Sequence, residues 1–315
     1  MHLGIKDCQV RPFWGEYLVP FTISTQTYMI VWCPLTMGGN LYVKKKLIFI
    51  IVLAVAFISL ASVLLLNIKN KLNPPKAFAG NVQSQSALLM RSKKLEGEGD
   101  LQGAQAAYQK LVGEFANSAE VAGWQKKIEE INIKLLFSPV INAKSVSYEI
   151  KAGDTLNKIA KEFRTTIELI KKSNNLSSDR IVPGRPVKIW TVPFSILVDK
   201  SQNTLILKTE EEVFKTYIVS TGANNATPVG TFRIANKIPN PTWFKAGAVV
   251  PAESPQNILG TRWLGFDLPG YGIHGTTEPQ SLGRQVTQGC VRMSNPDVEE
   301  LYTIVPSGTE VTIVD

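Results

Sequence analysis

The chain has 315 residues, of which 44% are hydrophobic and 19% are charged, a composition typical of globular proteins and a length that suits about two domains. The net charge of +8 would suit a nucleic-acid partner, but its basic residues are concentrated in two places. Six lysines flank one apolar run, and residues 145–191 carry nine Lys/Arg against five Asp/Glu. These two places account for the whole surplus, so we expect no nucleic-acid partner.

Residues 1–43 are predicted to form a cytoplasmic N-terminal segment. The first 36 of them show neither helical nor strand periodicity, whereas Met37 would begin a compact signal-anchor. We therefore hypothesise that translation begins at Met37.

An apolar run, "LIFIIVLAVAFISLASVLLL", follows from Leu47 to Leu66 and contains no charged residue. Its length predicts a single transmembrane helix, a signal-anchor over residues 44–67. The preceding "KKK" favours an N-terminus inside and a C-terminus outside, in the cell membrane with the rest of the chain facing the periplasm or cell wall. The alternative is a signal peptide cleaved near "AFAG", but the run is long for that role.

Residues 82–137 are predicted to be helical, because their apolar residues recur at three- and four-residue steps. The stretch "GDLQGAQAAYQKLVGEF" resembles a single tetratricopeptide-type unit. One unit cannot bury a solenoid core, so this region is interpreted as a packed spacer. Binding of an unknown protein partner is the alternative.

Residues 145–191 predict the order strand, helix, helix, strand. "YEIKAGDTL" at the front and "NNL" followed by "IVPG" at the back resemble the LysM module. The resemblance implies binding of N-acetylglucosamine-containing glycan by Gly153, Asp154, Thr155, Asn174 and the residues that follow it. The alternative is that these residues only cap the two helices. We expect the module to carry its own core, separate from the next domain.

Residues 194–315 contain many short apolar segments separated by turn residues, and one helix from Asp297 to Ile304. This pattern predicts a mainly antiparallel β-sandwich or barrel. His274 ends one predicted strand and Cys290 begins another, with a polar loop between them. They could form a catalytic couple, be buried core residues, or ligate zinc. Zinc needs about four ligands, which the chain beyond residue 67 lacks, so we expect no metal and no cofactor.

The segment "GIHGTTEPQSLGRQVTQGCVRMSNPD" and the upstream "ILVDKSQNTLILKTEEEVFKTYIVSTGANNATPVGTFRI" resemble L,D-transpeptidases of the YkuD type. The resemblance implies that Cys290 is the nucleophile, that His274 is its base, and that the carbonyl of Gly275 orients the imidazole. If so, the thiol should react faster than a model thiol at neutral pH.

Three further residues follow from the same segment. Gly289 leaves room for backbone N–H groups near the nucleophile to face an oxyanion. Arg292 suits a substrate carboxylate or developing charge, or forms an ordinary salt bridge. Thr287 contributes a hydroxyl beside the substrate where many family members carry serine.

The chain is therefore interpreted as multidomain: a transmembrane helix, a helical spacer, a LysM module and a mainly-β catalytic domain. The expected function is cross-linking of peptidoglycan stem peptides through a cysteine thioester. One alternative is hydrolysis of stem peptides by an L,D-carboxypeptidase or endopeptidase. The other is a non-catalytic protein tethered to the wall by LysM.

Overall fold

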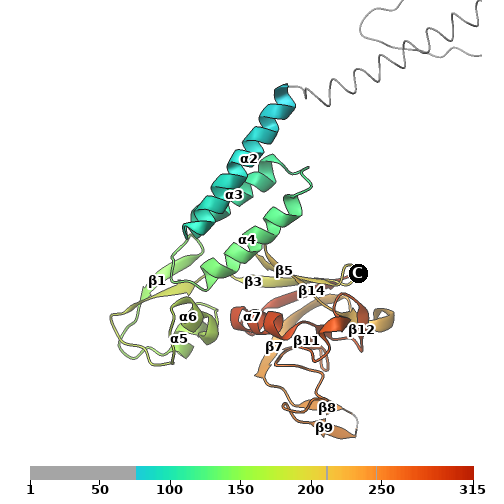
Figure 1. The fold of residues 1–315 in the computed structure, drawn as a ribbon. Coiled ribbons are helices and arrows are strands. Elements are labelled where there is room, and N and C mark those ends of the chain that lie inside the picture. Colours follow the sequence, from blue (N-terminus) through green and yellow to red (C-terminus); the bar gives the residue numbers. More distant parts are fainter. Residues whose placement is uncertain (1–75, 211, 246) are drawn as a thin grey trace, which may run out of the picture. The chain divides into compact units, whose positions relative to one another are not determined.

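The computed structural model describes residues 76–210, 212–245 and 247–315 (Figure 1). The predicted N-terminal segment 1–43 and signal-anchor 44–67 lie outside this part of the chain. Among the helices that it does describe, none has the length and apolar character needed to cross a membrane.

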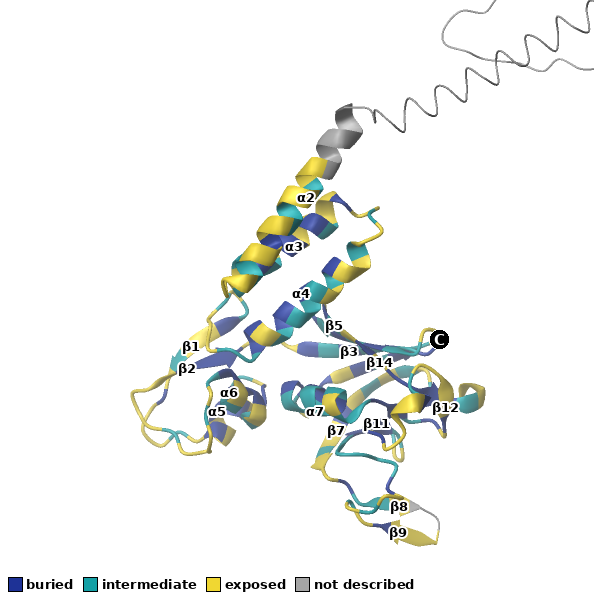
Figure 2. Cartoon of the chain, in the orientation of Figure 1, coloured by how far each residue is buried: buried dark blue, intermediate teal, exposed yellow. Residues whose placement is uncertain are grey.

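Three helices follow one another at the start of the described chain: α2 (Lys76–Gly97), α3 (Leu101–Glu114) and α4 (Val121–Leu136). The region is helical, as predicted. Apolar residues at three- and four-residue steps, such as Tyr108 and Leu111 of α3 and Ile128 of α4, build a small core between the helices. Figure 2 shows the buried residues along the facing sides of α3 and α4.

The next segment has the predicted order strand, helix, helix, strand. It consists of β1 (Ser145–Glu149), α5 (Leu156–Glu162), α6 (Ile167–Ser173) and β2 (Pro186–Trp190), with β1 and β2 antiparallel. Each helix begins at a threonine whose hydroxyl accepts a backbone N–H three residues on.

The C-terminal region is built on one mixed eight-stranded sheet with the order β13-β11-β10-β7-β14-β3-β4-β5. Most pairs are antiparallel, as predicted, but β14 runs parallel to β3 and β13 parallel to β11. Ser220, just after β5, pairs with Arg292 of β13 through two 2.8 Å backbone hydrogen bonds, so the chain links the two ends of the strand order. The strands are β3 (Phe194–Asp199), β4 (Thr204–Thr209), β5 (Glu212–Ile218), β7 (Gly230–Pro239), β10 (Arg262–Phe266), β11 (Gly272–His274), β13 (Val291–Arg292) and β14 (Glu310–Val314).

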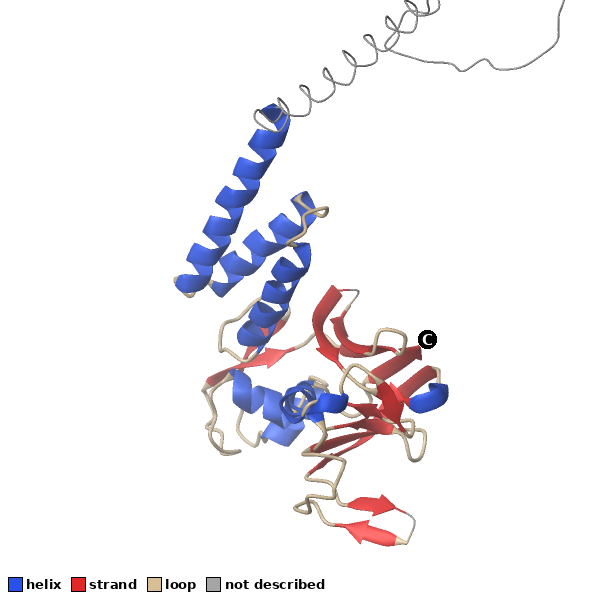
Figure 3. Ribbon diagram, turned by 45° about the vertical axis from the view of Figure 1, so that its right-hand side comes forward, coloured by secondary structure: helices blue, strands red, loops and turns tan. Residues whose placement is uncertain are grey.

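Smaller elements surround this sheet (Figure 3). Helix α7 (Asn295–Ile304) starts at the Ser294 cap, and β6 (Thr221–Gly222) pairs with β12 (Gln285–Thr287). A hairpin of β8 (Trp243–Lys245) and β9 (Ala248–Val250) was not anticipated, nor were β10 and β12. These segments are short or lack alternation, so their pairing depends on tertiary contacts.

The expectation of separate cores was wrong in part. The segment from β1 to β2 has its own cluster around Ile159 and Ile189, but Trp190 at its end belongs to the core of the eight-stranded sheet. The indole of Trp190 stacks on Phe194 with ring centroids 5.3 Å apart. A short apolar module gains stability by burying such a large aromatic side chain against its neighbour.

A buried lysine also joins the module to the helices. Nζ of Lys188 donates to the backbone carbonyls of Leu135, at 2.6 Å, and Ser138, at 2.8 Å, where α4 ends. A cation at a helix C-terminus is favourable because the last carbonyls lack partners within the helix. Burial lowers the pKa of Lys188 to about 8.

Candidate active site

The two parallel strands β11 and β13 bring the predicted couple together. Ile273 is paired with Val291, and His274 with Arg292. Ile273 and Val291 are fully buried on the core side, so alternation along the strands turns the neighbouring side chains to the other face. His274, Arg292 and Cys290 therefore share one face.

That face forms a cleft of about 730 Å³. Strand β8 and the loops before β11 and β13 contribute residues to its lining. Aromatic and apolar side chains make up much of the lining, which is typical of a ligand site with a few polar groups. The lining includes Trp243, Phe244, Trp263, Tyr271, His274 and Cys290.

The imidazole of His274 is held in one tautomer. Nδ1 lies 2.7 Å from the backbone carbonyl oxygen of Gly275, and because a carbonyl only accepts, Nδ1 carries the proton and Nε2 keeps its lone pair. The residue is only 3% exposed. Burial lowers the pKa of His274 to about 4, the hydrogen bond to Gly275 opposes this shift, and the charge of Arg292 adds to it.

Asn295 holds the backbone that carries this carbonyl. Its Oδ1 accepts from the N–H of Thr276, at 3.1 Å, and of Thr261, at 3.2 Å. A Cβ at Gly275 would lie 2.2 Å from the same oxygen, so only glycine fits there. Asn295 was not singled out from the sequence, because its contacts with Thr261 and Thr276 join separate segments that no local pattern connects.

Trp263 is a second residue that the sequence did not single out. It lies opposite His274 on β10, and the two rings stack. Its position in an unpredicted strand left no local pattern that would have found it.

The thiol of Cys290 is half-buried at the floor of the cleft. Its Sγ lies 3.5 Å from the carbonyl oxygen of Gly270, and no hydrogen bond to His274 is recorded in the described structure. Burial raises the pKa of Cys290, and the Gly272 N–H and the Arg292 charge only partly oppose this. At neutral pH the couple is therefore a thiol beside a neutral imidazole. Burial therefore works against the predicted fast reaction of the thiol, which stays a prediction to be measured.

Thr287 and Gly289 shape the turn before Cys290. The Thr287 hydroxyl donates to the carbonyl of Cys290, at 2.6 Å, and accepts the N–H of Gly289, at 3.2 Å. Gly289 has φ +131°, and a Cβ there would meet the Tyr271 ring at 2.7 Å. The N–H of Gly289 is already engaged by the Thr287 hydroxyl. The lack of a side chain at Gly289 lets the backbone lie close to the Tyr271 ring.

Arg292 is 7% exposed. Its Nη1 donates to Glu278 Oε2, at 2.9 Å, and to Ser281 Oγ, at 3.0 Å. The salt bridge considered from the sequence is therefore present. The Nε of Arg292 is buried without a hydrogen-bond partner among the described residues. This N–H is therefore one donor left for a further acceptor.

The predicted LysM residues have internal partners. Asp154 accepts from Tyr148 Oη, at 2.9 Å, and from the N–H of Lys151, at 2.8 Å. Thr155 caps α5, and Gly153 has φ +84° in the turn before it. The Asn174 amide bonds to the backbone of Ile170 and Lys188. Hydrogen bonds within the module use the polar side-chain groups of these residues. The residues therefore shape the two loops, and only their exposed edges remain for a ligand.

The comparisons with known proteins agree with this geometry. The model of the YkuD L,D-transpeptidase catalytic domain matches residues 193–313, and that of the LysM domain matches residues 148–190. YkuD of Bacillus subtilis, which carries an L,D-transpeptidase name, is 38% identical over 176 residues, covering 53% of this chain and 98% of that protein. YqjB of the same organism, also named for this activity, is 40% identical over 126 residues, covering 38% of this chain and 70% of that protein.

Proposed function

Because this chain belongs to the YkuD family of L,D-transpeptidases and carries a LysM domain, we propose that it cross-links peptidoglycan through a thioester on Cys290. The observation that carries the proposal is the shared face of Cys290 and His274 in one cleft, with Nε2 of the imidazole free to accept a proton.

The first half-reaction is acylation. The Cys290 thiol gives its proton to His274 Nε2 as Sγ bonds to the carbonyl carbon of the diamino acid in a donor stem tetrapeptide. The tetrahedral intermediate collapses, its C–N bond breaks, and the imidazolium protonates the departing amine of terminal D-alanine. A thioester remains. The low pKa of His274 suits this last step, because a weakly basic imidazole returns the proton readily.

The second half-reaction transfers the acyl group. An amine on a neighbouring stem attacks the carbonyl carbon of the thioester and loses a proton to His274 Nε2. The C–S bond then breaks, and the imidazolium gives that proton to the departing sulfur of Cys290. The N–H of Cys290, which has no recorded partner in the described structure, is the donor we assign to the oxyanion, since that of Gly289 is engaged. Arg292 lines the cleft, and we assign its positive charge to a substrate carboxylate.

The location follows from the sequence. The apolar run at 47–66 supports a single-pass anchor in the cell membrane, with the LysM and catalytic domains outside. There the LysM module would hold the glycan while the cleft works on the stem peptides.

Product analysis tests the proposal. The full chain is incubated with purified disaccharide-tetrapeptide, and the products are separated and weighed by mass spectrometry. We expect a cross-linked dimer and free D-alanine, both absent with Cys290→Ser. A trimmed tripeptide without dimer would instead identify an L,D-carboxypeptidase, and unchanged substrate would identify a wall tether.

A further inference from the structure

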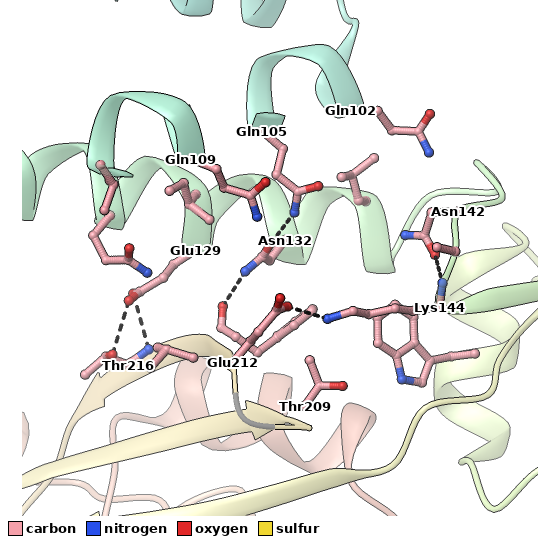
Figure 4. A pocket seen from close by; sticks show the side chains of 18 residues that line it. Gln102, Gln105, Gln109, Glu129, Asn132, Asn142, Lys144, Thr209, Glu212 and Thr216 are labelled. Carbon is pink, nitrogen blue, oxygen red and sulfur yellow. Dashed lines mark hydrogen bonds and ion pairs between the residues drawn. The ribbon is translucent and has the colours of Figure 1, made fainter. Parts of the chain in front are cut away.

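A second groove lies between helices α3 and α4 and the edge strand β5, and Cys290 does not line it (Figure 4). Its volume is about 750 Å³, similar to that of the catalytic cleft. Strand β5 ends the strand order at the opposite end from β13. None of the residues that line the groove also lines the cleft of Cys290, so a ligand bound in the groove does not contact the thiol.

Side chains of α4 take the place of a neighbouring strand along β5. Asn132 Nδ2 donates to the carbonyl of Phe214, at 2.8 Å. Glu129 accepts from the N–H and the hydroxyl of Thr216, each at 3.2 Å. An open sheet edge exposes unpaired backbone groups, and these bonds cap it and fix one wall of the groove (Figure 4).

The opposite wall is a row of amides. Gln102, Gln105 and Gln109 follow one another at steps of three and four residues, so they lie on one face of α3. Gln102 donates to the carbonyl of Ile141, at 3.1 Å, and Gln105 donates to Asn132. Gln109 makes no side-chain hydrogen bond in the described part of the chain. A side-chain amide both donates and accepts, as a peptide group does, so this row is complementary to an extended backbone.

The other groups in the groove favour a peptide over a sugar. Trp190 and Phe214 are each only 5% exposed, so neither presents a ring face on which a sugar could stack. Charges of both signs are present: Lys144 pairs with Glu212 at 2.6 Å, and Glu129 lies further along. This arrangement suits a ligand that carries both ammonium and carboxylate groups.

One buried hydroxyl is left without a partner in the groove. Thr209, at the end of β4, is 1% exposed, and its Oγ1 has no hydrogen-bond partner among the described residues. A buried, unpaired hydroxyl costs stability. A ligand group in the groove would satisfy it.

We propose that this groove binds a second, non-reacting stem peptide of peptidoglycan in an extended conformation. The inference rests on the proposed function, which places the chain against a polymer whose stems bear carboxylates and a diamino acid. Such a site would keep the enzyme on the wall while the cleft turns over.

The test uses the full chain carrying Cys290→Ser and the free stem tetrapeptide as the probe. The side-chain amide NMR signals of Gln109, assigned from their loss in Gln109→Ala, report on the groove separately from the cleft. We expect them to shift in a saturable way. Thr209→Val should weaken this binding about five-fold, the loss of one hydrogen bond of about 1 kcal/mol, while raising the melting temperature of the free protein.

Thr165→Val is the matched control, because its buried hydroxyl is also unpartnered but does not line this groove. It should stabilise the protein and leave the binding unchanged. Equal affinity of Thr209→Val and Thr165→Val, unshifted Gln109 signals, or an equal shift with the disaccharide alone would each overturn the proposal. Cross-linking by the protein that keeps Cys290 is measured in parallel. The proposal of a peptide groove and the proposal of cross-linking activity can then fail independently of each other.

Discussion

The indole of Trp263 stacks on the imidazole of His274, with ring centroids 5.9 Å apart and planes 17° apart. The indole is itself held by its N–H, which donates to Asn236 Oδ1 at 3.1 Å. One face of the His274 ring is thus covered by a fixed aromatic surface. This cover contributes to the burial that keeps His274 uncharged at neutral pH.

Burial of His274 should make folding stability depend on pH. Its pKa falls from 6.5 to about 4 on folding, so between these values the unfolded chain binds a proton that the folded chain does not. The free energy of unfolding should therefore drop as pH falls through this window, by up to about 3 kcal/mol. Urea unfolding at pH 4.5 and pH 7 measures the drop. His274→Gln should show a smaller one, and equal drops would contradict the assignment.

The rate at which Cys290 is alkylated should rise at a higher pH than that of a model thiol. Because burial raises the pKa of its thiol, the rate with iodoacetamide should keep increasing past about pH 9, where a model thiol levels off. Mass spectrometry of the Cys290 peptide separates this reaction from those of Cys8 and Cys33. Glutathione serves as the reference. A plateau reached below pH 8 would mean that the thiol is already ionised in the free protein.

Removal of the Asn295 side chain should loosen the support of His274. Asn295→Ala leaves the N–H groups of Thr261 and Thr276 without their acceptor, which should cost about 1–3 kcal/mol of stability and slow acylation. Asn295→Asp keeps an acceptor oxygen and should retain most of both. The measurements are urea unfolding and the pre-steady-state rate of D-alanine release. Equal acylation by Asn295→Ala and the natural chain would refute the positioning role.

The contribution of LysM is better tested by a point variant than by deletion, because Trp190 belongs to the catalytic core. Asp154→Ala removes the acceptor that joins Tyr148 and Lys151 in the turn after β1. We expect sedimentation with insoluble peptidoglycan to weaken about five-fold, roughly 1 kcal/mol, with unchanged turnover of soluble muropeptides. Glu162→Ala, an exposed carboxylate on α5, is the control. Equal sedimentation of the two variants would place wall binding elsewhere.

Local patterns in the sequence were sufficient to predict many of the helices and strands of this protein. Three-to-four-residue spacing predicted the helices of residues 82–137, and alternation predicted most strands of the catalytic sheet, because each pattern reflects one buried face of a single element. The candidate site around His274 and Cys290 could also be predicted from the sequence, since the motif residues lie within one short stretch of chain.

Only the tertiary structure decided how these elements meet. The parallel pairing of β11 with β13, the stacking of Trp263 on His274 and the support of Gly275 by Asn295 are contacts between separate elements, and no local pattern specifies them. The burial that lowers the pKa of His274 and raises that of Cys290 arises from the same contacts. The burial of the Thr209 hydroxyl without a partner is likewise decided by packing, around a different groove. Desolvation and hydrogen-bond satisfaction depend on every group packed around an atom, and the linear order of residues does not specify that set.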